Sequence, residues 1–374
     1  MFRTAIQFIR YDKPKSLGAL LGVVISVFLV GQQAGIFIFL TDAMKSIVAN
    51  NDQYIWVVDA KTVNANQLAQ LDTRIGRQLL SLPSVEAVYP VVIAAGAAQF
   101  EDGTTAGMTI IGSQSPDFVG GPWGIAPADK ALMAPEGAIL TEYFDQQTYG
   151  GVAKGEYFEL NGQKVYNAGF TRGVRGFGGA PYVFTTIERA RALSNFPTTR
   201  ASLFLVKWKP GAGMAATIAE INGTLPNVRA WDPERLAGST VQEVLASSGI
   251  ALSVGTLIIF ALLTGFIIIG LTLYSAAIDR IKDYGTLKAI GATNGYVSRL
   301  ILTQAMLISM VGFVLGRGLV EGFRQGIAQA GTIFAFPPAL ELGFLLITLF
   351  IALTGCLFAI RRINSLEPAQ VFRA

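Results

Sequence analysis

Four long intervals without a charged residue constrain this chain more than any other feature. They lie at residues 16–41, 244–278, 300–316 and 342–360 and contain 26, 35, 17 and 19 residues. A helix needs about 20 apolar residues to cross a bilayer, and an ionised side chain at its centre costs about 2.5–3.5 kcal/mol. The intervals therefore predict four transmembrane helices, which would leave both termini on the same side of the membrane.

The composition agrees with a membrane protein. Apolar residues make up 52% of the chain and charged residues 14%, against roughly 25% charged residues in soluble domains. The third interval is short, but Gly316 and Gly318 flank Arg317, whose side chain can extend to the interface, so we extend this span to residue 318. The first interval is long for a signal peptide and lacks a small-residue cleavage site, so we interpret it as a retained anchor.

Lysine and arginine set the orientation. Eleven of them flank the spans on one side, and the loop between the third and fourth spans has only Arg317 and Arg324. The positive-inside rule places the basic side in the cytoplasm. Residues 42–243 are then extracytoplasmic. Because residues 41–248 carry 16 basic and 19 acidic side chains, net −3, the overall charge of +4 reflects topology and does not indicate nucleic-acid binding.

The remaining boundaries follow from these spans. Residues 1–15 are expected to form a cytoplasmic interfacial helix, because Phe2, Ala5, Ile6 and Ile9 share one helical face. A basic N-terminus without a fixed helix is the alternative. Residues 279–299 form a cytoplasmic link, 319–341 a short extracytoplasmic loop and 361–374 a cytoplasmic tail.

The extracytoplasmic segment has the pattern of an α+β domain. Strands are predicted at 53–59, 85–100, 202–207 and 228–231, with helices at 64–82 and 214–222. The ends of the two units, 82–90 and 225–233, share Leu, Pro, Val, Ala and Pro at equal offsets. We therefore predict two β-α-β-like lobes from a degenerate repeat. Asn161-Gly162 lies between alternating runs and predicts a hairpin in a β-rich insertion.

Several chemistries are excluded or unsupported. The chain has no histidine and a single cysteine, Cys356, so it has no His-dependent triad, zinc-protease motif, internal disulfide or CxxC pair. No catalytic residue, metal site or bound cofactor is predicted. The Gly-rich loops at 118–124 and 169–179 can be ordinary loops or a partner-contacting tip.

Small residues predict close helix packing. Gly18/Gly22 and Gly31/Gly35 in the first span are small-xxx-small pairs, for which packing within the chain or a dimer interface is expected. Gln32 and Gln33 need polar partners in lipid. They can pair helices or line a substrate path.

The link between the second and third spans carries the most informative motif. Its residues Arg280, Asp283, Tyr284, Gly285, Leu287, Lys288, Ala289, Ile290, Gly291 and Ala292 occupy the places of R-x-x-E-[IY]-G-x-L-[RK]-A-[IL]-G-A. This motif resembles that of the FtsX-like, MacB-type ABC transporter permeases, with Asp283 replacing the commoner glutamate. From the residues alone, the link is a short helix ending at Gly291, with Leu287 and Ile290 apolar and Arg280, Lys282 and Lys288 exposed.

The layout and the basic, proline-containing tail at 361–373 extend this resemblance. The chain contains no GxxxxGK[ST] motif, so the free-standing permeases, such as LolC/LolE, FtsX and DevC-like proteins, are the nearer match. The resemblance implies a bacterial inner (plasma) membrane protein whose homodimer docks on two ABC ATPase subunits, which would bind ATP and magnesium.

The resemblance also implies a mechanism. The link would be a coupling helix, with Leu287, Ile290, Asp283 and Lys288 at the contact, and a continuous helix from Gln242 to Tyr274 would carry motion outward. A periplasmic adaptor and an outer-membrane channel accompany some relatives. The first hypothesis is export or extrusion of an amphiphilic, lipid-like or drug-like substrate. The alternatives are an FtsX-like regulator of a cell-envelope hydrolase and a receptor without an ATPase.

Overall fold

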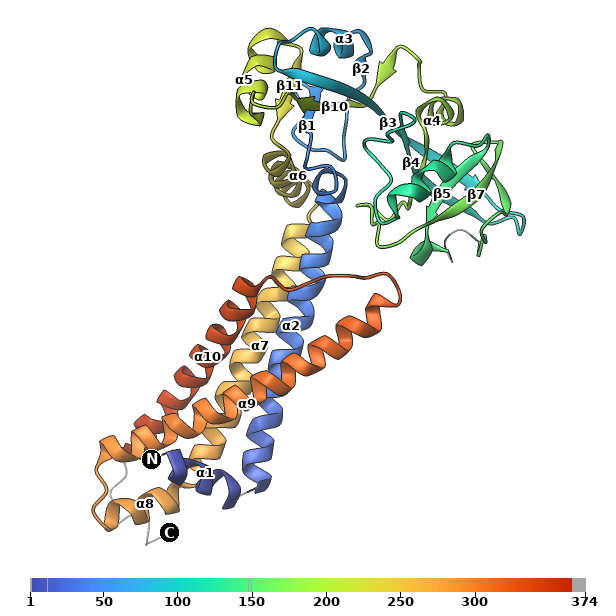
Figure 1. Cartoon of the computed structure of the whole chain (residues 1–374). Coiled ribbons are helices and arrows are strands. Elements are labelled where there is room, and N and C mark those ends of the chain that lie inside the picture. The colour runs from blue at the N-terminus through green and yellow to red at the C-terminus, as the bar shows by residue number, and fades with distance from the viewer. Residues whose placement is uncertain (1, 12, 147, 149, 365–374) are drawn as a thin grey trace. The chain divides into compact units, whose positions relative to one another are not determined.

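The computed structural model describes residues 2–11, 13–146, 148 and 150–364. The chain divides into two compact units (Figure 1). Leu40–Ala251 together with Gln329–Gly331 form a sheet-rich unit, and the other residues form a helical unit. The last ten residues of the predicted tail lie outside the described residues.

The helical unit contains the four expected spans. Four helices are long and apolar enough to cross a membrane, at Ser16–Ala49, Leu252–Ile278, Asn294–Ala328 and Pro338–Asn364. They belong to α2 (Lys13–Ala49), α7 (Ile250–Ile278), α9 (Asn294–Ala328) and α10 (Pro338–Asn364). Two short helices, α1 (Phe2–Tyr11) and α8 (Ile281–Ala289), complete this unit.

Glycines allow these long helices to approach closely. A side chain at Gly312 or Gly316 of α9 would collide with Val23 or Val27 of α2. Where α7 meets α10, a Cβ atom on Gly355 would lie 2.6 Å from the Cα atom of Gly270. The packing of α7 against α10 therefore depends on the absence of a side chain at Gly355.

The sheet-rich unit is built around two interleaved β-α-β units. The first consists of β1 (Ile55–Asp59), α3 (Arg74–Leu80) and β3 (Val85–Gln99); the second of β10 (Leu203–Trp208), α5 (Met214–Thr224) and β11 (Val228–Trp231). The strand order β11-β1-β10-β3 places β10 between the strands of the first unit and β1 between those of the second. This is the split β-α-β arrangement. The two predicted units thus share one sheet, because each contributes a strand to the middle of the other.

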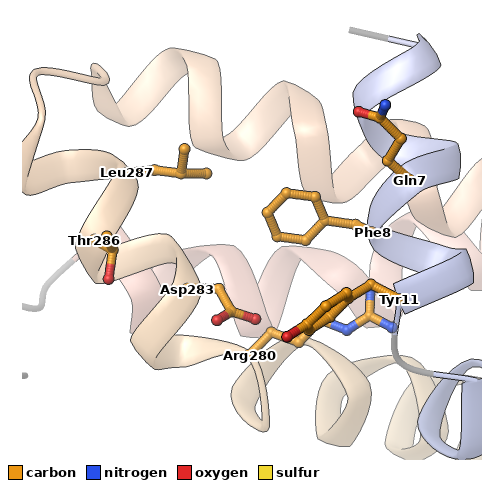
Figure 2. Close-up of a pocket in the computed structure, with 7 residues that line it drawn as sticks. All are labelled: Gln7, Phe8, Tyr11, Arg280, Asp283, Thr286 and Leu287. Carbon is orange, nitrogen blue, oxygen red and sulfur yellow. The ribbon is translucent and has the colours of Figure 1, made fainter.

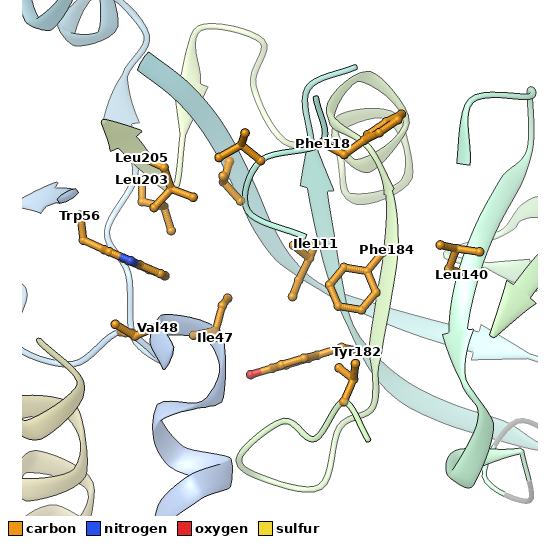
Figure 3. Packing of buried hydrophobic residues seen from close by; sticks show 14 of the residues in the cluster. Ile47, Val48, Trp56, Ile111, Phe118, Leu140, Tyr182, Phe184, Leu203 and Leu205 are labelled. Atoms are coloured by element: carbon orange, nitrogen blue, oxygen red, sulfur yellow. The ribbon is translucent and has the colours of Figure 1, made fainter. Parts of the chain in front are cut away.

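Each face of this sheet packs on helices. Ile55, Phe204 and Val206 lie in one buried cluster with Leu79 of α3 and Ile221 of α5. The alternate residue Trp56 lies in the other cluster, with Val48 at the end of α2 and Leu236 of α6 (Pro233–Ser247). Figure 3 shows this second cluster around Trp56 and Val48. Alternation along β1 therefore buries both faces of the sheet.

The predicted β-rich insertion continues the sheet into a closed barrel. The barrel order is β3-β4-β8-β5-β7-β6, and β6 returns to β3 through Ala98 opposite Leu160. At the predicted hairpin, Asn161 and Gly162 have φ angles of 52° and 76°, as a type I′ turn requires. The remaining bounds are β2 (Leu71–Asp72), β4 (Thr105–Ser113), η1 (Pro127–Met133), β5 (Ala138–Glu142), η2 (Tyr143–Asp145), β6 (Tyr157–Leu160), β7 (Gln163–Thr171), β8 (Tyr182–Thr186), α4 (Ile187–Ser194) and β9 (Arg200–Ala201).

The predicted helix at 64–82 is wrong over its first half. The helix forms only at Arg74–Leu80. Before it, the amide of Ala65 donates to the Oγ1 atom of Thr240, 2.9 Å away, and the amide of Asn66 donates to the Oδ1 atom of Asn64. Leu71 instead pairs with Ala201 in a two-stranded ladder. The strand pairing of Leu71 and Asp72 therefore takes up backbone groups in the middle of the predicted helix.

The predicted continuous helix from Gln242 to Tyr274 is also wrong. Helix α6 ends at Ser247 and α7 begins at Ile250. Gly249 between them has a φ angle of 67°, which lies outside the right-handed helical region. By contrast, α2 is a single helix of 37 residues that contributes to both units.

Candidate functional site

The link between α7 and α9 contains a helix with a defined end. Helix α8 spans Ile281–Ala289 and ends before Gly291, which has a φ angle of 101°. The amide of Ala292 donates to the carbonyl of Leu287, and that of Gly291 to the carbonyl of Lys288. These two bonds form a Schellman motif, for which glycine is the preferred residue. The Ile-Gly-Ala of the sequence motif therefore terminates the helix.

Polar contacts anchor the inner face of α8. The Nη2 atom of Arg280 donates to the Oγ atom of Ser16, 2.7 Å away at the start of α2. The hydroxyl of Tyr284 donates to the Oε1 atom of Gln304 on α9 at 3.1 Å. Arg280 and Tyr284 are 4% and 1% exposed. The link is thus tied by its inner face to the first and third spans.

Burial sets the chemistry of this face. It raises the pKa of Tyr284 to about 12, because an ionised phenol would lose its hydration. Tyr284 therefore stays neutral, and its hydroxyl donates a hydrogen bond to the Oε1 atom of Gln304. Among the described residues, the Nε atom of Arg280 and the Nε2 atom of Gln304 are buried without a hydrogen-bond partner. The expectation that Arg280 is exposed is wrong, since its guanidinium reaches inward between Ser16 and Gln304.

An open groove separates α8 from α1. It has a volume of about 470 Å³, and Figure 2 shows side chains of both helices around it. The ring of Phe8 on α1 stacks on that of Tyr284 with 6.1 Å between the centroids. The groove is lined by Gln7, Phe8, Tyr11, Arg280, Asp283, Thr286 and Leu287. Helix α1 is therefore part of the same surface as the link.

The predicted coupling residues divide into two sets. Arg280, Tyr284 and Gly285 are buried, so they hold the helix in place. Asp283, Ile290 and Gly291 are exposed, and the Ile290 side chain is 78% exposed.

Leu287 and Lys288 are half-buried. The Nζ atom of Lys288 donates to the carbonyl of Ile363 at the end of α10, and desolvation lowers the pKa of this lysine. Together, the two sets make a helix that is fixed on one side and open on the other.

Sequence reasoning missed Ser16, Gln304 and Phe8. Gln304 is a polar residue in the third charge-free interval, which is a signal of a buried partner in a membrane helix. Ser16 and Phe8 have no comparable signal, because nothing local indicates that α1 and the start of α2 meet α8.

The predicted packing residues of α2 lie within the helical unit. A side chain at Gly22 would collide with Thr272, one at Gly31 with Val320 and one at Gly35 with Phe334. Gly18 has open space around it. Three of these glycines therefore serve packing within the chain. Gln32 and Gln33 are half-buried.

Acidic residues and the cysteine do not gather in the described part of the chain. Across residues 2–11, 13–146, 148 and 150–364, no group of three or more Cys, Asp or Glu side chains could hold a metal ion.

Four apolar helices, a sheet-rich domain of split β-α-β design and a short anchored link are the features of a multi-pass membrane protein. The family model for the MacB-like periplasmic core domain matches residues 16–224, and that for the FtsX-like permease C-terminal region matches residues 255–368. The chain belongs to this MacB/FtsX family of ABC transporter permeases.

Two curated relatives match part of the chain. They are uncharacterized ABC transporter permeases of Mycobacterium tuberculosis, from strains CDC 1551 / Oshkosh and ATCC 25618 / H37Rv. Each is 27% identical over 125 residues, which is 32% of this chain and 34% of the relative. The chain thus matches about a third of the length of these relatives.

Two solved structures are also similar. The extracellular domain of the noncanonic ABC-type transporter YknZ from Gram-positive bacteria has a TM-score of 0.33 at 13% identity, covering 47% of this chain and 98% of that domain. The periplasmic region of MacB from Actinobacillus actinomycetemcomitans has a TM-score of 0.37 at 7% identity, covering 53% and 94%. These scores describe a loose likeness.

Proposed function

We propose that this chain is the membrane subunit of an ABC transporter, with α8 as the helix that docks on a separate ATPase. The observation that carries this proposal is the division of α8 into an anchored and an open face. A helix that transmits force must be fixed to the spans that move, and its other side must be free for the partner. Arg280 and Tyr284 supply the fixed side, and Ile290 and Asp283 the free side.

Ile290 is the principal contact in this proposal. An isoleucine that is 78% exposed leaves apolar area in water, which burial against a partner would remove at about 25 cal/mol per Å². Asp283 and Lys288 add one charge of each sign nearby. ATP and magnesium would bind to the ATPase, two copies of which would face two copies of this chain.

Helix α7 supports the proposed homodimer. Only 11% of its span is buried inside the structure, against 39–44% for the other three spans. Membrane helices gain from packing against one another through van der Waals contact. A second copy of the chain packed along α7 would supply these contacts.

The proposed route for motion is α2. The break at Ser248–Gly249 separates α6 from α7, whereas α2 continues without interruption from Lys13 to Ala49. A continuous helix transmits displacement better than one interrupted by a glycine with a positive φ angle. We assign the transmission of ATP-driven movement to α2.

The proposed cargo is amphiphilic, lipid-like or drug-like. An apolar groove of about 220 Å³ lies between α7 and α10, lined by residues that include Phe266, Tyr274 and Phe358. Such a lining suits an apolar portion of a substrate and offers no charge to a small ion. A periplasmic adaptor and an outer-membrane channel would complete the export path in a bacterium with two membranes.

The test is affinity capture of the tagged full chain from its native membrane in mild detergent. Proteins that co-purify are identified by mass spectrometry, and ATP hydrolysis is measured with and without candidate amphiphiles. The informative variant is Ile290→Asp. Leu80→Asp, at a 52% exposed leucine of α3, is the matched control.

We expect an ABC ATPase with the wild type and with Leu80→Asp, and its loss with Ile290→Asp. Recovery of the complex with Ile290→Asp would overturn the docking face. The regulatory alternative would be favoured if no amphiphile changes the rate of ATP hydrolysis and a cell-wall hydrolase co-purifies with the complex. Capture of the chain without any ATPase would contradict both.

A further inference from the structure

A second groove of the helical unit lies on the other side of α1 from the link. It has a volume of about 790 Å³. It is lined by Ile6, Ile9, Arg10, Lys13, Pro14, Ser16, Leu17, Leu20, Leu307, Ile308 and Val311. These residues belong to α1, the first turns of α2 and the middle of α9. The proposed docking face does not use this groove.

The lining has two chemically distinct parts. Leu17, Leu20, Leu307, Ile308 and Val311 form an apolar wall within helices that can cross the membrane. Arg10 and Lys13 are exposed basic residues where α1 meets α2. Among the residues that the structure describes, the lining includes no acidic side chain. An occupant would therefore need an acyl-like portion and an anionic group at one end.

We propose that this groove binds one anionic phospholipid, with its phosphate at Arg10 and Lys13 and an acyl chain along the wall of α2 and α9. Charge complementarity selects the headgroup, since a basic side chain near a membrane surface attracts anionic lipid by about 1 kcal/mol. The apolar wall commits the site to a lipid, because a free phosphate ion would leave this wall uncovered. Lys13 and Leu20 are seven residues apart in α2, which corresponds to about 10 Å along the helix axis.

One lining residue of the groove is bonded to the link. Ser16 lines it, and the Oγ atom of Ser16 accepts the hydrogen bond from Arg280. A lipid seated here would restrict the start of α2, on which Arg280 is anchored. This regulatory consequence rests on the proposed function of α8, whereas the lipid site itself does not.

The site is tested on the purified full chain without an ATPase. Native mass spectrometry in neutral detergent measures the retention of added dioleoylphosphatidylglycerol and, in parallel, of dioleoylphosphatidylcholine. The charge variant is Arg10→Gln/Lys13→Gln, and the control Arg3→Gln/Lys282→Gln removes two exposed charges that do not line the groove. The space-filling variant is Val311→Phe, with Val314→Phe as its control on the same helix.

We expect phosphatidylglycerol to be retained preferentially by the wild type and both controls. Each lost basic charge is expected to weaken retention about fivefold, and Val311→Phe is expected to displace the lipid without changing the net charge. Glycerol phosphate should not compete. Equal retention of the two lipids by the wild type would overturn the site. So would a loss of phosphatidylglycerol retention in Arg3→Gln/Lys282→Gln as large as in Arg10→Gln/Lys13→Gln, or full competition by glycerol phosphate.

Discussion

The Nη2 atom of Arg280 lies 2.7 Å from the Oγ atom of Ser16, although the two residues are 264 positions apart in the chain. This bond joins the start of the first span to the residue that precedes α8. A displacement of the link would therefore act directly on the first turn of α2 through this hydrogen bond. It is the most direct connection between the proposed docking face and the helix to which we assign transmission.

Replacing Arg280 tests that connection. Arg280→Met keeps the volume but leaves Ser16 and Gln304 without their shared donor, so we expect a loss of about 1–3 kcal/mol in stability. A double-mutant cycle with Ser16→Ala, measured by thermal unfolding in detergent, should give a coupling energy of at least about 0.5 kcal/mol. Lys282→Met, at an exposed position of the same helix, should change stability little. Additive effects of the two changes would contradict the connection.

Tyr284 should confer a dependence on alkaline pH. Burial raises its pKa to about 12, whereas the unfolded phenol titrates near 10. The native state then holds a proton that the unfolded state has lost, so this contribution is complete below pH 10 and is lost as pH rises to about 12. Tyr284→Phe should be about 1 kcal/mol less stable at pH 8 and should decline less between pH 10 and 12. Parallel pH profiles for the two proteins would refute this assignment.

Gly355 should tolerate no side chain. A Cβ atom there would meet the backbone of Gly270, which cannot move aside as a side chain can, so Gly355→Ala is expected to cost about 1–3 kcal/mol. Gly343→Ala is the control, because Gly343 lies on the same helix with open space around it. We expect the control to be neutral or slightly stabilising. Equal thermal stability of the two variants would show that the helices separate easily here.

Arg175 should hold the loop between α9 and α10 to the barrel. Its Nη1 atom pairs with Asp145, and its Nε and Nη2 atoms donate to the carbonyls of Gly331 and Ala330. In Arg175→Ala, amide exchange at 329–333 is expected to accelerate at least about tenfold, equivalent to about 1.4 kcal/mol. Arg229→Ala, which removes only a stacking contact with Trp231, should leave that exchange unchanged. Unaltered exchange in Arg175→Ala would mean that the loop is held by other contacts.

Flexible insertions should distinguish the connection through α2 from the connection through α6 and α7. Two glycines inserted after Leu40 interrupt α2, whereas two inserted after Ser248 lengthen an existing break. We expect the first to abolish the response of ATP hydrolysis to cargo and the second to reduce it less than twofold, because only the first creates a new hinge. The measurement is the cargo-stimulated ATPase rate of the reconstituted complex. The opposite order would assign transmission to α6 and α7.

Local patterns predicted the elements that local chemistry determines. The charge-free intervals identify the four spans because the cost of burying a charge depends on each residue separately. The Asn161-Gly162 hairpin follows from the backbone preferences of two adjacent residues. The motif at 280–292 likewise located the link and its termination at Gly291.

Long-range pairing accounts for most of what the sequence did not reveal. The interleaving of β1 and β10 depends on strand partners about 150 residues apart, and the segment before α3 is held by Thr240 and Ala201. Arg280 looked like a solvated cation because charged residues are rarely buried. Its inward position depends on Ser16 and Gln304, which no local pattern connects to it.

The edges of the shared sheet bear on how the domain avoids self-association. The edge strand β11 has only four residues, the side chain of Asn222 bonds the amide and carbonyl of Ala230 in it, and Pro233 follows it closely. The first half of β3, which pairs with β10 alone, contains Pro90. Short edges and prolines offer few unpaired backbone groups to a neighbouring molecule, so they discourage edge-to-edge aggregation. Closing β6 onto β3 gives the barrel the same protection without proline, because a closed barrel has no edge to offer a neighbouring molecule.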